Sequence, residues 1–193
     1  ALIPELLKKI KINQFEIIVV DDYSKDKSVN YVKKLKKNNV KIISHNQRYG
    51  QSVAIYSGII NAKYNTILTM DGDLQSNYLD ANILINCYFN LYKGKYKLIN
   101  GYRKDRKDSI SKKFASNIAN TIRKNILNDG INDSGSGIRI FDKKTFFKLP
   151  HFINMHRFLP ALFKLSEHEI LEVEVSHNLR KHGKSNYNNL KRF

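Results

Sequence analysis

The sequence contains no tryptophan, one cysteine, three prolines and nine glycines among its 193 residues. A single cysteine excludes a disulfide framework and a cysteine-based structural zinc site. The scarcity of proline and glycine excludes collagen-like and linker-like sequence. No apolar run approaches the roughly 18–20 residues that a membrane-spanning helix needs. These absences leave a globular, reduced domain, and we expect Cys87, which falls in a predicted helix, to lie in its core.

Positive charge is what the chain has in excess. Its 34 lysines and arginines exceed its 17 aspartates and glutamates, which gives a formal net charge of +17. One interpretation is a solvated, lysine-rich surface. The other is an anionic partner such as nucleic acid, an acidic membrane face or a phosphorylated substrate. Nucleic-acid sites favour arginines and aromatic residues interleaved on one face. Because the lysines here are scattered along the chain, we do not expect nucleic acid to be the partner.

Short apolar runs alternate with helical periodicity along the chain. Apolar runs without polar alternation predict buried strands at residues 15–20, 40–43, 66–70, 97–101, 137–141 and 170–175. Helical spacing predicts helices at residues 2–10, 26–38, 51–63, 77–92, 111–127 and 157–165. This alternation predicts one α/β domain over residues 1–193, with a mostly parallel sheet and helices on both faces. Ligands of such sheets bind beyond the carboxyl ends of strands, where the acidic clusters at residues 21–22 and 71–73 fall.

The second acidic cluster has the composition of a metal site. Asp71 and Asp73 flank Gly72, whose missing side chain leaves room for a bound group, and Gln75 adds a neutral oxygen. Hard oxygen ligands of this kind suit Mg²⁺ or Mn²⁺ that keeps positions open for phosphate oxygens. The alternative is a plain polar turn, because Asp-Gly is a common turn pair. The position directly after a buried strand favours the metal site.

Two basic segments follow later in the chain. Arginine binds phosphate in bidentate fashion and stays protonated, so it can neutralise a leaving diphosphate. The first segment follows the fourth predicted strand and contains Arg103, Arg106, Lys112, Lys113 and Arg123. The second is a glycine-containing loop at residues 180–185, which could fold over a phosphate. The alternative for the first segment is an exposed basic helix face, and the alternative for the second is a mobile tail. The six histidines show no metal-ligand spacing, and no phosphate-binding P-loop motif is present.

Several blocks occur together in a fixed order: residues 16–26 (EIIVVDDYSKD), 70–75 (MDGDLQ), 101–108 (GYRKDRKD), 155–162 (MHRFLPAL), and 172–177 (EVEVSH) continuing to 183–185 (GKS). Together they resemble a family 2 glycosyltransferase of the GT-A fold, a Rossmann-like fold of nucleotide-diphospho-sugar transferases. The most similar members are bacterial enzymes like dolichol-phosphate-mannose synthase. These transfer a sugar from a nucleotide diphosphate to a polyprenyl phosphate, such as undecaprenyl or dolichyl phosphate, in cell-envelope or glycan biosynthesis. The resemblance covers residues 15–187.

The resemblance implies roles for individual residues. The positions that match nucleobase contacts are Val20 and Asp22. The positions that match the Mg²⁺ or Mn²⁺ and diphosphate site are Asp71, Gly72, Asp73 and Gln75. Arg103 and Arg180 match arginines that face the donor phosphates in the family. The resemblance implies that Asp73, Arg103 and Arg180 are the catalytic residues. The acceptor phosphate is matched by Lys112, Ser116 and Ser185. The resemblance also implies an anionic membrane surface as partner and a location at the cytoplasmic face of the cell membrane, peripheral or anchored by segments outside this chain.

The chain departs from the family pattern at several points. The family opens with a strand ending in Pro-x-Tyr-Asn-Glu, and no such strand is present in residues 1–193, so we expect the first strand to be missing. Residues 76–78 (SNY) replace an Asp/His-Pro-Pro sequence, and residues 134–137 (SGSG) replace a cysteine-bearing segment. Asn186 stands where a lysine is common.

Two other functions remain open from the sequence. The first is transfer to a hydroxyl group of a glycan, which requires a carboxylate base. Asp133 is the candidate for that base, although its flanks differ from the usual Glu-Asp pair, and the absence of tryptophan removes the Gln-x-x-Arg-Trp motif of processive synthases. The second is a non-catalytic, basic domain that binds nucleic acid. A phosphate acceptor needs no strong base, which agrees with the lack of an obvious one.

Overall fold

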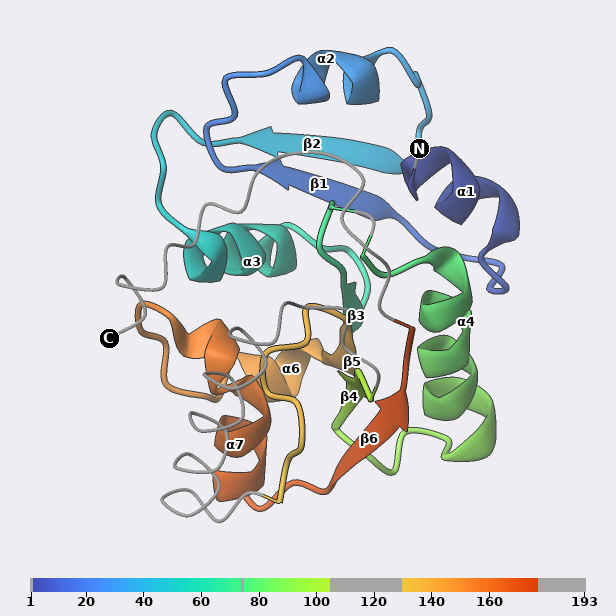
Figure 1. The fold of residues 1–193 in the computed structure, drawn as a ribbon, viewed down its shortest axis with the longest axis vertical. Helices are drawn as coiled ribbons and strands as arrows, with labels where there is room; N and C mark the ends of the chain where they lie inside the picture. The colour runs from blue at the N-terminus through green and yellow to red at the C-terminus, as the bar shows by residue number, and fades with distance from the viewer. Residues whose placement is uncertain (1, 74, 105–129, 177–193) are drawn as a thin grey trace.

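The computed structural model describes residues 2–73, 75–104 and 130–176, drawn in colour in Figure 1. Its elements, in chain order, are α1 (Leu2–Lys9), β1 (Ile17–Asp21), α2 (Ser28–Lys33), β2 (Val40–Ser44), α3 (Gln51–Ile60), β3 (Thr66–Thr69), α4 (Tyr78–Asn86), the π-helical turn η1 (Cys87–Leu91), β4 (Leu98–Tyr102), β5 (Arg139–Asp142), α6 (Lys143–Phe146), the 3₁₀ turn η2 (Met155–Arg157), α7 (Leu159–Leu165) and β6 (Ile170–Glu174). The helix predicted at residues 111–127 lies outside the described residues.

The described strands form two sheets. β1 and β2 pair in parallel, from Ile17 opposite Val40 to Asp21 opposite Ser44. The second sheet has the order β3-β5-β4-β6. In it β5 runs antiparallel to both β3 and β4, while β4 and β6 are parallel. The α/β class is confirmed, and β3, β4 and β6 share one direction as expected. The reversed β5 makes this sheet mixed, a feature that the sequence analysis did not predict.

The core lies on the two faces of the second sheet. Consecutive residues of a strand point to opposite faces, and in β4 Leu98 and Ile99 belong to different clusters. The Leu98 cluster also contains Phe141, Phe146 and Phe163 and is covered by α6 and α7. The other cluster packs against α4 and η1 and contains the buried Cys87, as expected. Helices therefore cover both faces of this sheet (Figure 1).

The two-stranded sheet is less buried than its sequence suggested. The run at residues 15–20 predicted a strand buried on both faces, yet every residue of β1 is only half-buried. The reason is that β1 pairs only with β2 within the described residues. In β4 and β5, by contrast, every residue but the last is buried, because these strands lie inside the four-stranded sheet between the two hydrophobic clusters.

Candidate functional site

The first acidic cluster lies at the carboxyl end of β1, as predicted. The Asp22 carboxylate accepts hydrogen bonds from the backbone N–H groups of Tyr49 (2.8 Å) and Gly50 (2.7 Å), and its Oδ1 lies 2.8 Å from His45 Nδ1. Burial alone raises the pKa of Asp22, but these hydrogen bonds outweigh it and lower the pKa overall. Asp22 thus fixes the turn that leads into α3. Val20 packs against the same helix, because a Cβ added to Gly58 would lie 3.3 Å from Val20 Cγ2.

The second acidic cluster follows β3. Asp71 Oδ1 accepts a hydrogen bond from Gln51 Nε2, in the first turn of α3, at 3.0 Å. Asp73 Oδ1 accepts one from the backbone N–H of Gln75 at 3.1 Å. A Cβ built on Gly72 would meet no atom within 4 Å, so the structure leaves the open space there that the sequence suggested. Asp71, Gly72, Asp73 and Gln75 therefore share one loop, and Gln51 joins that loop to the turn fixed by Asp22.

The donor atoms of this loop fit Mg²⁺ or Mn²⁺ in chemical type. Both aspartate carboxylates and the Gln75 amide are hard oxygen ligands, and Asp71 is exposed to solvent. Among the residues that the structure describes, no group of three or more His, Cys, Asp or Glu side chains gathers as a metal cage. A pair of carboxylates suits Mg²⁺, which is commonly held by one or two carboxylates together with substrate phosphates and water.

Arg103 and Asp133 form a buried ion pair beyond the end of β4. Arg103 Nε lies 2.6 Å from Asp133 Oδ2, and Arg103 Nη2 lies 2.9 Å from Oδ1, so the contact is bidentate. The Asp133 side chain is 3 % exposed and that of Arg103 12 %. Asp133 Oδ1 also accepts the backbone N–H of Gly135 at 3.2 Å. Both oxygens of the carboxylate that the sequence offered as a catalytic base are therefore engaged in holding Arg103 and its loop.

Arg139 is a second buried arginine, which the sequence analysis did not single out. It lies in β5 and donates to Asn100 Oδ1 (2.8 Å), the carbonyl oxygen of His156 (2.7 Å) and that of Ser134 (2.5 Å). Desolvation lowers the pKa of Arg139 to about 10, although the nearby charges of Asp133 and Asp71 favour the protonated form. Arg139 remains charged at neutral pH and joins β4, β5 and η2 behind the site.

His156 connects this network to α3. Its Nδ1 lies 2.7 Å from the hydroxyl oxygen of Ser52, the residue that follows Gln51 in the first turn of α3. Burial, reinforced by the charges of Arg139 and Arg157, lowers the pKa of His156 to about 4. The imidazole is therefore neutral at physiological pH and acts as a hydrogen-bonding partner rather than a positive charge.

Ser136 adds an unusual polar group to the segment between Arg103 and Asp71. Its side chain is buried at 2 % exposure, and its Oγ has no hydrogen-bond partner within the described structure. On one side, Gly135 lies against the Arg103 guanidinium. On the other, a Cβ on Gly137 would lie 2.1 Å from Asp71 Oδ2. The segment therefore fits against Asp71 only because Gly137 lacks a side chain, while a Cβ at Gly135 would make a tight contact of 3.3 Å with Arg103 Nη2.

The predicted site residues are thus partly brought together. Asp71, Asp73 and Gln75 lie on one loop, and Asp22 is linked to that loop through α3. Arg103 lies on the far side of the segment at residues 134–137. Seven further residues that the sequence singled out lie outside the described ranges: Arg106, Lys112, Lys113, Ser116, Arg123, Arg180 and Ser185. The network residues that sequence reasoning missed are Gln51, Ser52, Asn100, Arg139 and His156. Arg139 carried a usable signal, because an arginine inside an apolar strand must find buried partners.

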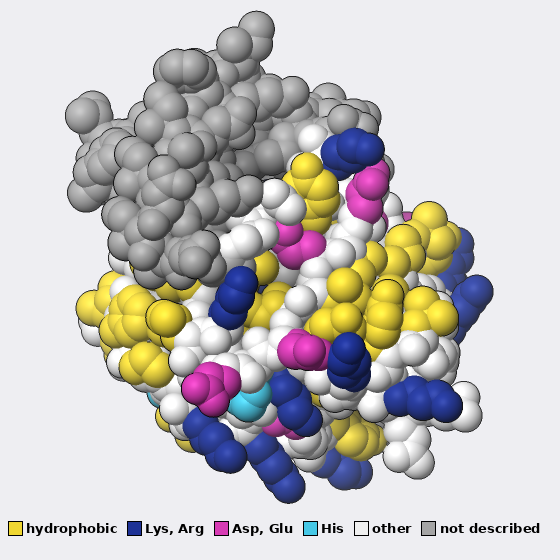
Figure 2. All heavy atoms as spheres, turned by 90° about the horizontal axis from the view of Figure 1, so that it is seen from below, with side chains coloured by type: hydrophobic (Ala, Val, Ile, Leu, Met, Phe, Trp, Pro, Cys, Tyr) yellow, Lys and Arg dark blue, Asp and Glu magenta, His cyan; other side chains and the backbone are white. Residues whose placement is uncertain are grey.

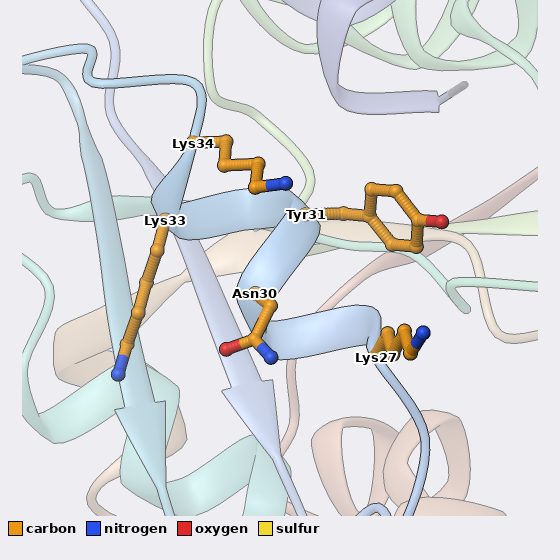
Figure 3. A pocket seen from close by; sticks show the side chains of 5 residues that line it. All are labelled: Lys27, Asn30, Tyr31, Lys33 and Lys34. Carbon is orange, nitrogen blue, oxygen red and sulfur yellow. The ribbon is translucent and has the colours of Figure 1, made fainter.

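The lysine-rich surface of α2 lies away from this site. A shallow hollow on α2 is lined by Lys27, Asn30, Tyr31, Lys33 and Lys34 (Figure 3). Its lysine side chains do not converge on one point in Figure 3, and none of the residues of the site described above lines it. Figure 2 shows lysines and arginines interspersed with apolar and acidic side chains rather than gathered in one stripe. None of the helices in the described ranges is long and apolar enough to cross a membrane.

Comparison with known proteins places this geometry in a family. The chain is 32% identical over 181 residues to dodecaprenyl-phosphate galacturonate synthase of Rhizobium johnstonii, covering 91% of this chain and 53% of that protein. It is 27% identical over 181 residues to undecaprenyl-phosphate 4-deoxy-4-formamido-L-arabinose transferase of Edwardsiella ictaluri, covering 92% and 54%. The chain therefore spans about half the length of the curated relatives it matches.

A solved structure shares the fold. Glucosyl-3-phosphoglycerate synthase from Mycobacterium tuberculosis, in complex with Mn²⁺, uridine diphosphate and glucosyl-3-phosphoglycerate, superposes with a TM-score of 0.67 at 13% identity, covering 88% of this chain and 62% of that one. This likeness confirms the expected fold of nucleotide-sugar transferases. The model of the family described as "Glycosyl transferase family 2" matches residues 1–149. The chain belongs to glycosyl transferase family 2.

Proposed function

We propose that this chain is the catalytic domain of an inverting glycosyltransferase that moves a sugar from a nucleotide-diphosphate sugar to a polyprenyl phosphate. The observation that carries the choice of acceptor is the burial of Asp133 in its bidentate pair with Arg103. A hydroxyl acceptor needs a carboxylate to take its proton, and this carboxylate is occupied. The curated relatives, named for transfer to dodecaprenyl or undecaprenyl phosphate, support the same acceptor.

The donor would lie across the carboxyl ends of β1 and β3. Val20 and Asp22 would border the nucleobase, with Asp22 acting partly by fixing the turn before α3. Asp71, Asp73 and Gln75 would hold Mg²⁺ or Mn²⁺, which neutralises diphosphate charge when bound. The solved relative with Mn²⁺ and uridine diphosphate supports this use of a divalent ion. Gly72 would leave the backbone open to the diphosphate.

The reaction proposed is a single displacement. An oxygen of the lipid phosphate attacks the anomeric carbon of the sugar, and the bond from that carbon to the donor diphosphate breaks. The electron pair of the broken bond leaves with the nucleoside diphosphate. No proton has to be removed, because the attacking phosphate is already ionised at neutral pH. Arg103, preset by Asp133, and Arg180 would stabilise the charge on the leaving group. Lys112, Ser116 and Ser185 would face the acceptor phosphate.

We propose that residues 1–193 form one catalytic domain completed by a further strand outside this chain. The support is the break between the two sheets, since β1 pairs only with β2 and β3 only with β5 within the described residues. The domain would work at the cytoplasmic face of the cell membrane. The excess of positive charge supports this location, because lysines near an anionic membrane surface each contribute about 1 kcal/mol of attraction.

The acceptor is tested by transfer of radiolabelled sugar from a panel of nucleotide-diphosphate sugars in detergent. Undecaprenyl phosphate, undecaprenol and a free oligosaccharide are compared as acceptors. We expect labelled product with the phosphate alone, and chelation of divalent cations should stop its formation. Transfer to undecaprenol or to the oligosaccharide would favour the hydroxyl-acceptor function. Strong, salt-dependent binding to arbitrary DNA without any transfer would favour the nucleic-acid alternative.

A further inference from the structure

An apolar projection lies between α6 and α7. Four large apolar side chains of residues 147–158 are exposed: Phe147 (37 %), Phe152 (45 %), Ile153 (81 %) and Phe158 (37 %). We refer to residues 147–158 as the projecting segment. Leaving apolar surface of this size in water forgoes the free energy that burial would give, roughly 25 cal/mol per Å². Several such side chains on one short segment are therefore a feature that a binding partner would explain.

The structure holds this segment in a defined conformation. Met155 is 4 % exposed and belongs to the core beside Leu98. The next residue, His156, is tied to Ser52 and Arg139. The backbone N–H of Met155 donates to the Phe152 carbonyl at 3.1 Å, and Asn154 turns the chain with a left-handed φ of 68°. The buried neighbours on one side therefore fix Phe152 and Ile153 in the exposed position.

The projecting segment lies in a stretch of the chain that is rich in basic residues. Residues 143–166 contain no aspartate or glutamate, and Asp142 and Glu167 border that stretch. The same stretch contains five basic residues: Lys143, Lys144, Lys148, Arg157 and Lys164. Lys144 and Lys148 are exposed beside Phe147, whereas the Lys143 ammonium donates to the Ala62 carbonyl and Lys164 lies in the last turn of α7. Exposed apolar side chains flanked by lysine and arginine are the combination that binds the interface of an anionic bilayer, where apolar burial and electrostatic attraction add.

The position of the segment relates it to the candidate site. Figure 1 shows that the chain before α7 lies beside the first turn of α3. Both are on the side of the molecule toward which the arrows of β1 and β2 point. The contacts agree, because His156 meets Ser52 in the first turn of α3, and the neighbouring Gln51 holds Asp71. A bilayer that covered the projecting segment would therefore lie on the side of the molecule where the acidic loop is found.

We propose that the projecting segment docks this domain on an anionic lipid bilayer, with Phe152 and Ile153 entering the headgroup region and the surrounding lysines contacting lipid phosphates. The purpose of docking rests on the proposed function, because docking would bring the site to an acceptor carried by lipid. Docking itself is a property of the surface and is measured without any reaction.

The test is co-sedimentation of the protein, with the segment that supplies the further strand retained, with vesicles of phosphatidylcholine alone or mixed with phosphatidylglycerol. We expect binding to the mixed vesicles, weakened by salt. The double variant Phe152→Ser/Ile153→Ser should bind at least about tenfold more weakly, equivalent to about 1.4 kcal/mol. The matched control is Ile83→Ser/Leu91→Ser, which removes two comparably exposed apolar side chains from α4 and η1, 42 % and 62 % exposed, on the other side of the sheet. It should bind like the wild type.

Charge is tested in the same assay. Lys144→Ala/Lys148→Ala should weaken binding to the mixed vesicles by at least about tenfold. The matched control, Lys33→Ala/Lys34→Ala on α2 (Figure 3), should have a smaller effect although it removes the same charge. Equal effects of both pairs would mean that net charge alone drives binding and would overturn the proposal. A lipid-independent dimer that the Phe152/Ile153 variant abolishes would also overturn it, in favour of a second copy as partner.

Activity separates this proposal from the proposed function. With a short, water-soluble prenyl phosphate as acceptor, the Phe152→Ser/Ile153→Ser variant should retain wild-type transfer, and with acceptor in vesicles it should lose it. Wild-type binding to vesicles without transfer to either acceptor would contradict the proposed function and leave docking standing. Transfer to both acceptors with full vesicle binding by the variant would contradict docking and leave the proposed function standing.

Discussion

The pair of Arg103 and Asp133 gives the sharpest test of how the site works. Replacing Asp133 with alanine leaves a guanidinium that is only 12 % exposed without its carboxylate. Breaking a buried ion pair by removing one partner costs about 3–5 kcal/mol, and the slight exposure of Arg103 places the expected loss near the lower end. Asp133→Asn keeps one acceptor oxygen and the side-chain shape, so we expect it to lose about 1–3 kcal/mol.

The stability prediction is measured by urea unfolding of four proteins: wild type, Arg103→Ala, Asp133→Ala and the double variant. If the pair acts as a unit, the double variant loses clearly less stability than the sum of the single variants, because no unpaired buried charge remains. Additive losses would show that the two side chains stabilise the fold independently and would refute the interpretation of their contact.

The same four proteins decide the role of Asp133 in transfer. If Asp133 only positions Arg103, adding Asp133→Ala to the Arg103→Ala variant should leave kcat/KM nearly unchanged. If Asp133 is a general base, the added change should cost the roughly 10²–10⁴-fold that loss of such a base typically costs. A further loss of that size in the Arg103→Ala background would refute the positioning role and restore the hydroxyl acceptor.

Two further predictions concern the network behind the site. The fold lowers the pKa of His156 from 6.5 to about 4, so the unfolded chain takes up the proton first as the pH falls. The wild type should therefore lose up to about 3 kcal/mol of its free energy of unfolding between about pH 6.5 and pH 4. Urea unfolding of His156→Asn should lack this loss, and a pH profile equal to that of the wild type would contradict the prediction. Arg139→Lys keeps the charge, but a lysine cannot reach Asn100, Ser134 and the His156 carbonyl together. Because acceptors are then left unpaired, we expect the free energy of unfolding in urea to fall by about 2 kcal/mol or more. A decrease below about 0.5 kcal/mol would contradict the role of Arg139 in joining these elements.

The sequence predicted the positions of the acidic clusters well, for a physical reason. An apolar run that ends abruptly in aspartate predicts both the strand and the residue at which the chain leaves the sheet. Asp21 accordingly ends β1, and Asp71 follows β3 by two residues. Strand direction carried no such mark. The apolar run of β5 would look the same in either orientation, and its direction depends on how the chain returns from β4.

The contacts that assemble the site were beyond the sequence for a different reason. Ser52 and His156 are 104 residues apart, and neither belongs to a pattern with ligand spacing. Asp133 was considered as a base from its chemical type, since nothing in its neighbours revealed that Arg103 would enclose it. By contrast, the position of Arg139 between Ile138 and Ile140 does predict buried hydrogen-bond partners, because a charge inside a buried apolar run has to be compensated by hydrogen bonds.

Gly137 provides the last prediction, because the acidic loop depends on its missing side chain. An added Cβ would lie 2.1 Å from Asp71 Oδ2 and 2.4 Å from its Cγ, distances at which the carboxylate must move. Gly137→Ala should therefore displace Asp71 and weaken Mn²⁺-dependent binding of donor, measured by calorimetry, by at least about tenfold, or ~1.4 kcal/mol. The fold should persist, because the Asp71 side chain is exposed and can swing away. Gly72→Ala is the matched control for the free protein, since its Cβ would meet no atom within 4 Å. Unchanged donor affinity in Gly137→Ala, with wild-type stability, would show that Asp71 is not needed where the structure places it.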